Sequence, residues 1–437
     1  MRKTNMKYML GLKMRAFPSH KQELIIKKNL DASRFIYNQL LANSYVDSAI
    51  HRNKLEKLYP IPEKYWKYTK KGKVIAKSKK RPTGLDRITA NKYPWLLDKD
   101  LDSLMPYNVQ IDYQAAWNLF RKVNRAGHPK FKRKLAAKQS YSTNCQYVGL
   151  KEAPSLFNGT VRFIDNNHIK LPKLGKLKVV LSKKLPQDQT IRITRATVSH
   201  LATGEYFVSL LMKSNLPLVP RYPKTGSEVG YDLNVKNFLM DSNGTEVDNP
   251  KFYRRAKERL AKEQRVLSRR QVRAKKEGRR LSQAKNYQKQ KAKVAKLHRR
   301  IFNQRHSFLD QLSTAYIKNH DLVVGEDLKS KNLLKNHALA MNISDTGWKS
   351  FISMLEYKAP LHGKTFVLVN PAYTTQTCFD CKFVMGTKGT KKLTLNQREW
   401  DCPNCKAHHI RDHNAAKNIL AKGYSALRIA DNEKVFS

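Results

Sequence analysis

The N-terminal residues combine a strand pattern with a helix pattern. Residues 7–17 alternate loosely between apolar and polar side chains and stop at Pro18, which predicts one strand. Ser19 stands three residues before Gln22, the spacing of a capping box, and apolar residues then recur at helical spacing to about Ala49. The sequence therefore predicts a strand followed directly by a long helix.

A second helix is predicted further along the same region. Pro106 suits a first helical turn, apolar residues recur at helical spacing behind it, and the helix ends before Gly127. Residues 51–100 are rich in lysine and predict a basic loop. The block from Ser19 to about Ser140 is therefore expected to be mostly helical and basic.

From about Gly159 the hydrophobic period changes from helical to strand-like. Short apolar segments separated by turn residues are typical of a small antiparallel barrel, and they lie at 161–164, 169–171, 177–181, 191–198 and 206–212. We expect the N-terminal strand to join this barrel, so that the helical block is an insertion into it. The predicted divisions are 1–18 for the first barrel strand, 19–144 for the helical domain and 145–222 for the rest of the barrel.

The second half of the chain follows a proline-rich linker and has a mixed pattern. It predicts strands at 229–238, 322–328 and 365–369, a helix at 346–362, and a last helix with Asp412 in its first turn. The predicted divisions are a mixed domain at 223–369, a cysteine-bearing module at 370–406, and a final helix with the tail at 407–437. The whole chain is thus predicted to be a multidomain α+β protein.

Charge restricts the class of partner. The 437 residues include 86 Lys or Arg against 34 Asp or Glu, a formal net charge of +52. The positive residues run through the whole chain, and a polyanion relieves self-repulsion of this size, so nucleic acid is the expected partner. An anionic membrane surface is the rival interpretation. Because the sequence has no apolar run of 18 residues and no signal-peptide core, we expect a cytoplasmic protein that binds no membrane.

Residues 251–305 carry the strongest local charge. They contain 22 Lys or Arg and three acids, interleaved with apolar residues at helical spacing. A solvated helix face is the ordinary interpretation of such a run, but this excess of positive charge is larger than solubility needs. We therefore predict a long helical hairpin that contacts the phosphates of a nucleic-acid backbone.

Four of the five cysteines form two Cys-x-x-Cys pairs, Cys378 with Cys381 and Cys402 with Cys405. Two such knuckles predict a structural zinc site, in which four thiolates fill a tetrahedral shell and leave no open position for catalysis. The alternative is a loop with reduced cysteines. His408 and His409 could replace a thiolate, but a complete set of cysteines favours surface positions or nucleic-acid contacts for both histidines.

Three acids end core elements of the second half: Asp232, Glu326 and Asp412. Hydrolysis of a phosphodiester needs such a set, because carboxylates hold two divalent cations about 4 Å apart, one activating water and the other stabilising the leaving oxygen. Taken singly, each acid is more often a loop or cap residue, and the helix dipole alone could favour Asp412. The prediction of a metal-dependent nuclease site rests on the trio.

Several stretches carry a family resemblance: 230–233 (Gly-Tyr-Asp-Leu), 326–328 (Glu-Asp-Leu), 370–378 and 411–418. Through these motifs the chain resembles TnpB, the family of transposon-encoded RNA-guided nucleases related to the type V CRISPR effectors. The motifs cover the C-terminal half. The N-terminal half is similar in layout, with 130–133 (Lys-Phe-Lys-Arg) among the few matching pieces.

The sequence departs from the family pattern at four positions. Asn234 stands where glycine is usual, Lys382 and Lys406 follow cysteines where glycine is common, and Ile410 replaces an aspartate that often precedes the arginine. Because asparagine tolerates a left-handed turn, Asn234 is expected to leave the predicted strand pair intact. None of the four departures removes a predicted catalytic acid.

The resemblance implies an RNase H-like (RuvC) nuclease domain with an inserted zinc ribbon, and a split antiparallel β-barrel (the wedge domain) with a helical recognition insertion. Asp232, Glu326 and Asp412 would bind two Mg²⁺ ions, with Mn²⁺ as a substitute, and the four cysteines would bind one structural Zn²⁺. The partners would be a guide RNA from the same locus, double-stranded target DNA next to a short adjacent motif, and the RNA–DNA heteroduplex. One protein copy is expected per RNA, in the bacterial cytoplasm and associated with the nucleoid when on target.

Three other functions fit parts of this pattern. A nuclease-inactive, RNA-guided repressor would be expected to have lost one of the acids, and all three are present. A transposase that moves DNA by itself usually has a glutamate as its helical acid, whereas this chain has Asp412. A compact type V CRISPR effector is barely separable on sequence, although a length of 437 residues favours the transposon protein.

Overall fold

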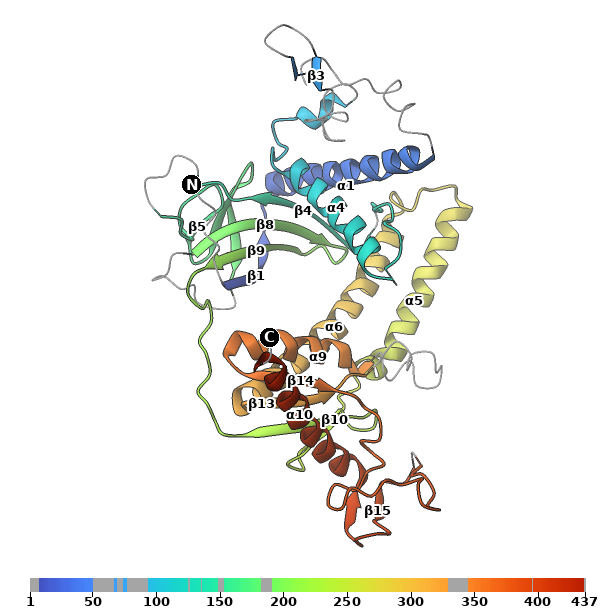
Figure 1. Cartoon of the computed structure of the whole chain (residues 1–437). Coiled ribbons are helices and arrows are strands. Elements are labelled where there is room, and N and C mark those ends of the chain that lie inside the picture. Colours follow the sequence, from blue (N-terminus) through green and yellow to red (C-terminus); the bar gives the residue numbers. More distant parts are fainter. Residues whose placement is uncertain are drawn as a thin grey trace. The chain divides into compact units, whose positions relative to one another are not determined.

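The computed structural model describes residues 8–49, 67–68, 74–76, 93–124, 126–134, 136–147, 153–181, 191–328, 345–394 and 396–435 (Figure 1). Most of the predicted loop at 51–100 lies outside these residues. The chain divides into two compact units, Met1–Leu218 (unit 1) and Val219–Ser437 (unit 2). The division falls within the proline-rich linker.

Unit 1 is built on a seven-stranded antiparallel sheet with the order β4-β8-β9-β1-β7-β6-β5. The strand expected at 7–17 is β1, which lies in the middle of the sheet between β9 and β7. The helical block therefore interrupts the sheet after its first strand. The strands are β1 (Tyr8–Phe17), β4 (Lys138–Asn144), β5 (Arg162–Asp165), β6 (His168–Leu171), β7 (Gly175–Val180), β8 (Ile191–Leu201) and β9 (Tyr206–Ser214).

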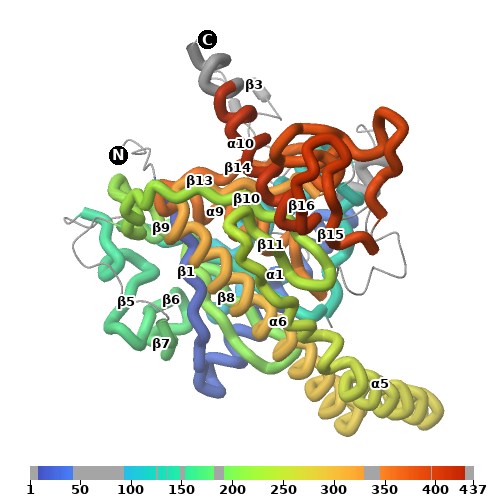
Figure 2. The backbone as a smooth tube through the Cα atoms, turned by 90° about the horizontal axis from the view of Figure 1, so that it is seen from below, coloured from blue at the N-terminus to red at the C-terminus, as the bar shows by residue number. Residues whose placement is uncertain are grey.

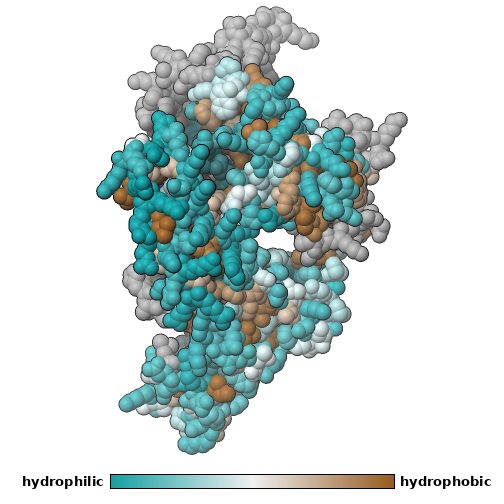
Figure 3. Space-filling view, turned by 180° about the vertical axis from the view of Figure 1, so that it is seen from behind, coloured by the Kyte–Doolittle hydropathy of each residue, from teal (hydrophilic) through white to brown (hydrophobic). Residues whose placement is uncertain are grey.

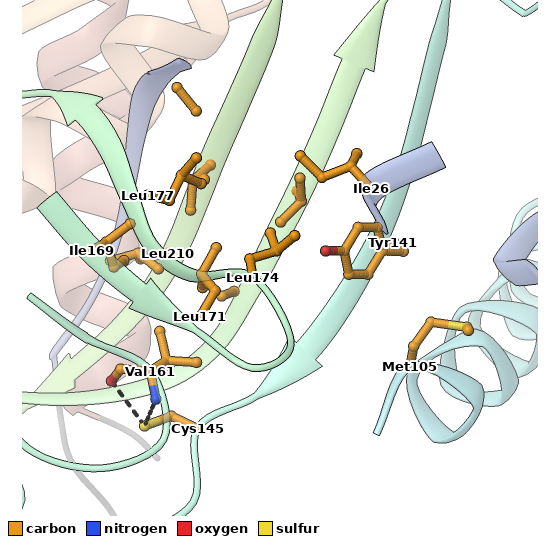
Figure 4. Packing of buried hydrophobic residues seen from close by; sticks show 14 of the residues in the cluster. Ile26, Met105, Tyr141, Cys145, Val161, Ile169, Leu171, Leu174, Leu177 and Leu210 are labelled. Atoms are coloured by element: carbon orange, nitrogen blue, oxygen red, sulfur yellow. Dashed lines mark hydrogen bonds between the residues drawn. The ribbon is translucent and has the colours of Figure 1, made fainter. Parts of the chain in front are cut away.

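The sheet of unit 1 curves until its two edges meet. Thr160, before β5, donates its backbone N–H to the carbonyl of Gln146, after β4, at 3.0 Å. Next to this bond, Cys145 Sγ lies 3.2 Å from the Val161 carbonyl oxygen (Figure 4). The curved sheet encloses a mainly apolar interior to which its strands contribute residues that include Ile169, Leu171, Leu177 and Leu210 (Figure 4).

One predicted boundary in unit 1 is wrong. The helical domain was expected to extend to residue 144, but β4 pairs with β8 along its whole length and belongs to the sheet. The strand is polar apart from Tyr141, so it has no apolar alternation to reveal it. Hydrogen bonds take the place of apolar packing, because Ser142 Oγ lies 2.8 Å from Thr197 Oγ1 and Thr143 Oγ1 donates to Asp102 Oδ1 at 3.0 Å.

Among the described residues between β1 and β4, two α-helices occur, α1 (His20–Ala49) and α4 (Met105–Lys122), and a short 3-10 turn η2 (Pro94–Leu97) precedes α4. The predicted capping box at the start of α1 is confirmed. The Ser19 N–H donates to Gln22 Oε1 at 2.9 Å, and the Gln22 N–H donates to Ser19 Oγ at 3.4 Å. A small two-stranded sheet of β2 (Lys67–Tyr68) and β3 (Val74–Ala76) also precedes α4.

Unit 2 contains a mixed five-stranded sheet with the order β12-β11-β10-β13-β14. Strands β12, β11 and β10 pair antiparallel, whereas β10, β13 and β14 are parallel. All five residues of β13 are buried, and the four that precede its final acid carry no polar side chain, as is typical of central strands in parallel sheets. The bounds are β10 (Glu228–Leu233), β11 (Leu239–Asp241), β12 (Glu246–Val247), β13 (Leu322–Glu326) and β14 (Thr365–Val369).

Within its described residues, unit 2 has the helices α5 (Phe252–Lys276), α6 (Lys285–Asn319), α9 (Trp348–His362) and α10 (Arg411–Val435). Helices α5 and α6 run side by side as a hairpin, joined by an apolar seam that includes Leu260, Val294 and Ile301 (Figure 2). Helix α6 continues fourteen residues beyond the predicted end at 305, because Leu309 and Ile317 pack into the core beside the sheet.

The surface agrees with the composition. The face in Figure 3 is mainly hydrophilic, and its hydrophobic residues form separate small patches. Among the helices in the described ranges, none combines the length and the apolar character needed to cross a membrane.

Candidate metal centre and zinc-binding module

Two of the predicted acids lie at the centre of the unit 2 sheet. Asp232 is on β10, Glu326 is the last residue of β13, and the parallel pairing aligns Gly230 with Val324. Asp232 follows this pair by two residues on β10, and Glu326 follows it by two residues on β13. Each residue is 7% exposed, so the two carboxylates share one largely buried region.

The third acid, Asp412, is in the first turn of α10, which packs across these strands. Gly230 allows the close approach of the helix, since a Cβ there would lie 2.4 Å from the Ala416 carbonyl oxygen and 2.7 Å from the Leu420 nitrogen. The glycine before the strand acid is therefore a packing requirement. It brings the start of α10, and with it Asp412, toward the acids of the sheet.

The three acids influence one another electrostatically. Burial raises the pKa of Asp232 well above its ordinary value, and the negative charges of Glu326 and Asp412 raise it further. Arg411 and Arg398 oppose this shift with their positive charges. A buried carboxyl that is repelled by two other carboxylates is a position at which a bound cation relieves repulsion.

Glu326 is oriented by a residue beyond the strand that follows it. Thr374 Oγ1 donates a hydrogen bond of 2.6 Å to Glu326 Oε1. Burial raises the pKa of Glu326, while the Thr374 hydrogen bond and the charge of Lys422 lower it. One carboxylate oxygen is thus fixed by Thr374, which leaves the other available to a ligand.

Asp412 is held by two arginines and one asparagine. Arg398 Nη1 donates to Oδ2 at 3.0 Å, and Arg411 Nε donates to Oδ1 at 3.0 Å. Asn234 Nδ2 lies 3.3 Å from Oδ2, and its own Oδ1 accepts the N–H of Asn237 at 2.8 Å. As expected, Asn234 leaves the strand pair intact, because β10 and β11 still pair antiparallel. It does so without a positive φ, and its side chain links the strand turn to Asp412.

Sequence analysis missed Thr374, Asn234 and Arg398 as site residues. Thr374 lies inside a recognised motif and Asn234 directly follows one, but neither has a charge or spacing that indicates its role. Arg398 lies in the loop before the second cysteine pair and resembles any other exposed base of this chain. The one available signal is that Arg398 lies two residues before Trp400. Because Trp400 is buried, the backbone next to it is fixed.

The residues present suit a hard divalent cation. Carboxylate oxygens are the ligands that Mg²⁺ prefers, and the pKa of Asp232 is raised first by burial and then by the negative charges of Glu326 and Asp412. Within the described residues the three carboxylates do not form a group as tight as that of the cysteines, whose sulfurs all lie within 4.8 Å of one another.

The four cysteines converge on one point. Cys378 Sγ lies 3.7 Å from Cys405 Sγ, and Cys381 Sγ lies 3.5 Å from Cys402 Sγ. Four sulfurs bound to zinc at about 2.3 Å would be about 3.8 Å apart, so the cluster has the size of a zinc shell. Burial raises the pKa of the Cys378 thiol to about 12, which means that a nearby cation is needed to keep it deprotonated at neutral pH.

The two lysines that replace glycine after the knuckles adopt the conformation that glycine favours. Lys382 has a φ of 62° and Lys406 a φ of 60°, both left-handed. Their N–H groups donate to the carbonyls of Cys378 and Cys402 at 3.0 and 2.9 Å, which closes each knuckle. The turn is therefore kept despite the substitution, at a cost in backbone strain.

Two predictions about this module are wrong. His409 is not a surface residue: it is 8% exposed, its Nε2 lies 3.0 Å from Cys378 Sγ, and its ring packs 4.8 Å from that of Trp400. The module also extends past residue 406, because β16 (His408–Ile410) pairs with β15 (Glu399–Asp401). His408, by contrast, is exposed and lies 2.8 Å from Asp401.

Three family models match the chain in sequential order. They are described as "Helix-turn-helix domain" (HTH_OrfB_IS605, residues 6–45), "Probable transposase" (OrfB_IS605, residues 208–337) and "Cas12f1-like, TNB domain" (residues 348–419). The second match contains Asp232 and Glu326, and the third contains the four cysteines and Asp412. The chain belongs to the TnpB family.

Two curated relatives of this TnpB-family chain are named as putative RNA-guided DNA endonucleases. A protein of Streptomyces pristinaespiralis named "Putative RNA-guided DNA endonuclease" is 39% identical over 268 residues, which span 61% of this chain and 61% of that protein. InsQ of Escherichia coli K12, with the same description, is 28% identical over 97% of this chain and 94% of its own length. The match to the Streptomyces protein thus spans about three fifths of that protein's length.

A solved structure also aligns with this TnpB-family chain. In a cryo-EM structure of a Cas12f1–sgRNA–target DNA complex, the matched chain shows a TM-score of 0.49 and 15% sequence identity. The alignment covers 94% of this chain and 98% of the other.

Proposed function

We propose that this chain is an RNA-guided DNA endonuclease of an insertion-sequence transposon. The observation that carries the proposal is that Asp232 and Glu326 lie on the adjacent parallel strands β10 and β13, with Asp412 on the helix that packs across them, so that the charges of both other acids act on Asp232. The names of the relatives and the net charge of +52 support nucleic acid as both guide and substrate. Double-stranded target DNA next to a short adjacent motif is the proposed substrate.

The architecture supports this function at the level of domains. We assign the mixed sheet of unit 2, with α10 across it, to an RNase H-like (RuvC) nuclease domain, and the cysteine cluster between β14 and α10 to its inserted zinc ribbon. The curved sheet of unit 1 corresponds to a wedge barrel, and α1 and α4 belong to its recognition insertion. In open sheets with parallel strands, ligands bind beyond the carboxyl ends of the strands, and Glu326 is the last residue of such a strand.

The proposed reaction is hydrolysis of a phosphodiester of target DNA. Two Mg²⁺ ions, for which Mn²⁺ can substitute, would activate the attacking water and stabilise the leaving oxygen. Asp232, Glu326 and Asp412 would hold the ions through their carboxylate oxygens. Thr374 orients the Glu326 carboxylate, and burial of the Asp232 carboxylate limits its access to water.

The arginines beside Asp412 have two tasks in this proposal. Arg398 and Arg411 fix the carboxylate from both oxygens, so its direction depends on groups from the zinc-binding module and from α10 itself. Their positive charge also opposes the repulsion that raises the pKa of Asp232. The side chain of Arg398 is 45% exposed, so it can also contact a phosphate that enters the site.

The zinc-binding module is assigned a structural function. One Zn²⁺ held by four thiolates has no open position, and it would fix the loop that carries Arg398. Metal analysis of the purified protein should find about one zinc per chain. A protein that cuts its target normally and contains no zinc would contradict this assignment.

The α5–α6 hairpin supplies the strongest local positive charge. Outside the apolar seam, the exposed side chains of α5 are mainly Lys and Arg, and Arg305 of α6 is fixed by Asp345 at 2.6 Å. Asp345 also accepts the N–H groups of Tyr253 and Arg254 at the start of α5. A hairpin with Lys and Arg along its outer surface suits a nucleic-acid backbone, which includes the guide RNA and the RNA–DNA heteroduplex.

The test is to purify the protein with the RNA of its own locus and to sequence that RNA. The guide segment is then changed, and cleavage of plasmids carrying the old or the new target is measured in magnesium. The proposal predicts that cleavage follows the new guide. Cleavage that ignores the guide, or that needs no RNA, would contradict it.

A further inference from the structure

His409 lies inside the zinc-binding module, against one of the four cysteines. Its Nε2 is 3.0 Å from Cys378 Sγ, and the residue is 8% exposed. The pairing of β16 with β15 places His409 opposite Trp400, and the centres of the two rings lie 4.8 Å apart. The imidazole is therefore fixed by strand register and by packing on Trp400. The proposed function gives this contact no task.

His409 reaches Cys378 from outside the group of four sulfurs. The four sulfurs all lie within 4.8 Å of one another, as the ligands of one ion do. Among the described residues, His409 forms a second such group with Cys378 and Asp380, and this group contains none of the other three cysteines. A fifth ligand would also exceed the four-coordinate shell of a structural zinc. His409 therefore contacts a ligand of the predicted ion and is not itself a ligand.

The neighbours of Nε2 determine the direction of the hydrogen bond. Besides Cys378 Sγ, Nε2 lies 3.7 Å from Asp380 Oδ2. A zinc-bound thiolate and a carboxylate both accept hydrogen bonds and donate none. A lone pair at Nε2 would face two negative groups, whereas an N–H there satisfies them. Nε2 therefore carries the proton and donates to the sulfur.

Burial makes this donor important. Cys378 and Cys402 are completely buried, whereas Cys405 is exposed. Water cannot solvate the thiolate of a buried cysteine, so its negative charge must be balanced by the ion and by hydrogen bonds from the protein. A hydrogen bond to an ionised acceptor is about twice as strong as one between neutral groups. Loss of the donor should therefore weaken the hold on the ion itself.

We propose that His409 is a positioning residue of the zinc site, which donates its Nε2–H to the Cys378 thiolate and slows the loss of the ion. Outer partners of this kind orient a ligand, and their removal typically costs about 10-fold to about 100-fold in metal affinity. His409 also lies three residues before Asp412, so it connects the four thiolates to the start of α10. This inference rests on the proposed function in one respect, since it assumes the structural zinc.

The test compares full-length variants that separate the donor from the packing of the ring. His409→Phe keeps an aromatic ring beside Trp400 and removes the N–H, whereas His409→Gln removes the ring and keeps a side-chain N–H donor. His408→Phe is the matched control, because His408 is exposed on the same strand. Zinc affinity is measured at neutral pH by competition with a coloured chelator, and the rate of zinc release is measured in an excess of the same chelator. Melting temperatures of the zinc-loaded proteins show that each variant folds.

His409→Phe is expected to bind zinc about 10-fold to about 100-fold more weakly than the wild type, and to release it faster. His409→Gln should keep most of the wild-type affinity, because its amide N–H replaces the lost donor. His408→Phe should behave like the wild type. The proposal is overturned if His409→Phe binds zinc like the wild type. Equal losses in His409→Phe and His409→Gln would also overturn it, because they would assign the effect to ring packing.

Replacement of zinc by Co²⁺ gives a readout that packing alone would not move. Without the donor, the sulfur holds its electrons less tightly, so the sulfur-to-cobalt charge-transfer band of His409→Phe should shift to longer wavelength. The band should stay at its wild-type position in His408→Phe, and the d–d bands of all variants should remain those of a tetrahedral four-sulfur site. An unshifted charge-transfer band in His409→Phe would overturn the proposal. Altered d–d bands in that variant would make His409 a ligand and would overturn it equally.

Failure of the proposed function is distinguishable from failure of this inference. A wild type that contains no zinc would overturn the zinc assignment and this inference together, and metal analysis shows this before any variant is made. A wild type that holds zinc but never cuts guided DNA would contradict the nuclease alone. The comparison of His409→Phe with His409→Gln would still decide the function of the donor.

Discussion

Arg398 Nη1 donates a hydrogen bond of 3.0 Å to Asp412 Oδ2, so a residue of the zinc-binding module directly contacts one of the three acids. The loop that carries Arg398 runs between Leu393 and Trp400, two buried residues of the cysteine cluster. The direction of the Asp412 carboxylate therefore depends on whether the module is folded. Through this contact a zinc ion bound by the cysteines would influence the proposed cleavage reaction.

Arg398→Gln is expected to lower guided cleavage while leaving target binding unchanged. The variant removes a donor that fixes Asp412, and misplacement of a reacting group by about 1 Å can cost about 100-fold in rate. Cleavage and binding should be measured on the same RNA-loaded preparation. Lys391→Gln, an exposed lysine of the same module, is the matched control and should cut like the wild type. Equal cleavage by the two variants would contradict the role of Arg398.

Gly230→Ala is expected to destabilise unit 2. The new Cβ would lie 2.4 Å from the Ala416 carbonyl oxygen, so α10 must move away from β10, and overpacking of this kind costs about 1–3 kcal/mol. Gly11→Ala on β1 is the control, because its Cβ would meet no atom within 4 Å. Chemical denaturation measures both. A Gly230→Ala protein as stable as Gly11→Ala would show that α10 does not pack as described.

Lys382→Gly and Lys406→Gly are expected to stabilise the zinc-binding module. Both lysines have a positive φ, which costs a non-glycine residue about 1–2 kcal/mol, and glycine removes this strain. The measurement is the rate at which a chelator removes zinc, which should fall. Lys391→Gly has no such strain to relieve and should leave the rate unchanged or raise it. Faster zinc loss from the Lys382→Gly variant would contradict the argument.

Asp232→Asn is expected to raise the melting temperature of the metal-free protein near neutral pH. The pKa of Asp232 is raised in the folded chain, so its charged form is less favourable there than in the unfolded chain, where the ordinary value is 3.8. The stability that the protonated carboxyl contributes is present at low pH and is lost as the pH rises above that ordinary value. The variant should therefore show no gain over the wild type in strong acid, and a clear gain at neutral pH.

Addition of magnesium supplies the control for this prediction. The cation should raise the melting temperature of the wild type by relieving the carboxylate repulsion, and it should do so much less for Asp232→Asn. An equal rise in both proteins would place the bound magnesium elsewhere.

The regular elements of this chain were largely predictable, because their hydrophobic periods are clear. The strand at 7–17, the capping box of Ser19 and Gln22, and the apolar strand ending at Glu326 each depend on local pattern alone. β4 could not be predicted in this way. Its burial depends on polar partners from distant segments, Thr197 and Asp102, which have no local signal in the sequence.

The candidate site was likewise predictable only in part. Charge and spacing indicated the three acids and the four cysteines, whose assigned functions stay predictions until they are tested. The groups that orient them, Thr374, Asn234 and Arg398, become visible only when three distant segments meet. His409 was misassigned for this reason: its sequence neighbour His408 is exposed, whereas the pairing of β16 with β15 turns His409 toward Cys378.

The most direct test of the central claim is to compare cleavage and binding by Asp232→Ala and by the wild type, each loaded with the same RNA. Removal of this carboxylate should reduce magnesium-dependent cleavage by several orders of magnitude, because metal binding and alignment of the water are lost together. Guided target binding should stay near the wild-type level, and Glu246→Ala, an exposed acid on β12, should cut normally. If Asp232→Ala cuts as well as the wild type, or if the wild type binds its target but never cuts in magnesium or manganese, the three-acid nuclease site is wrong.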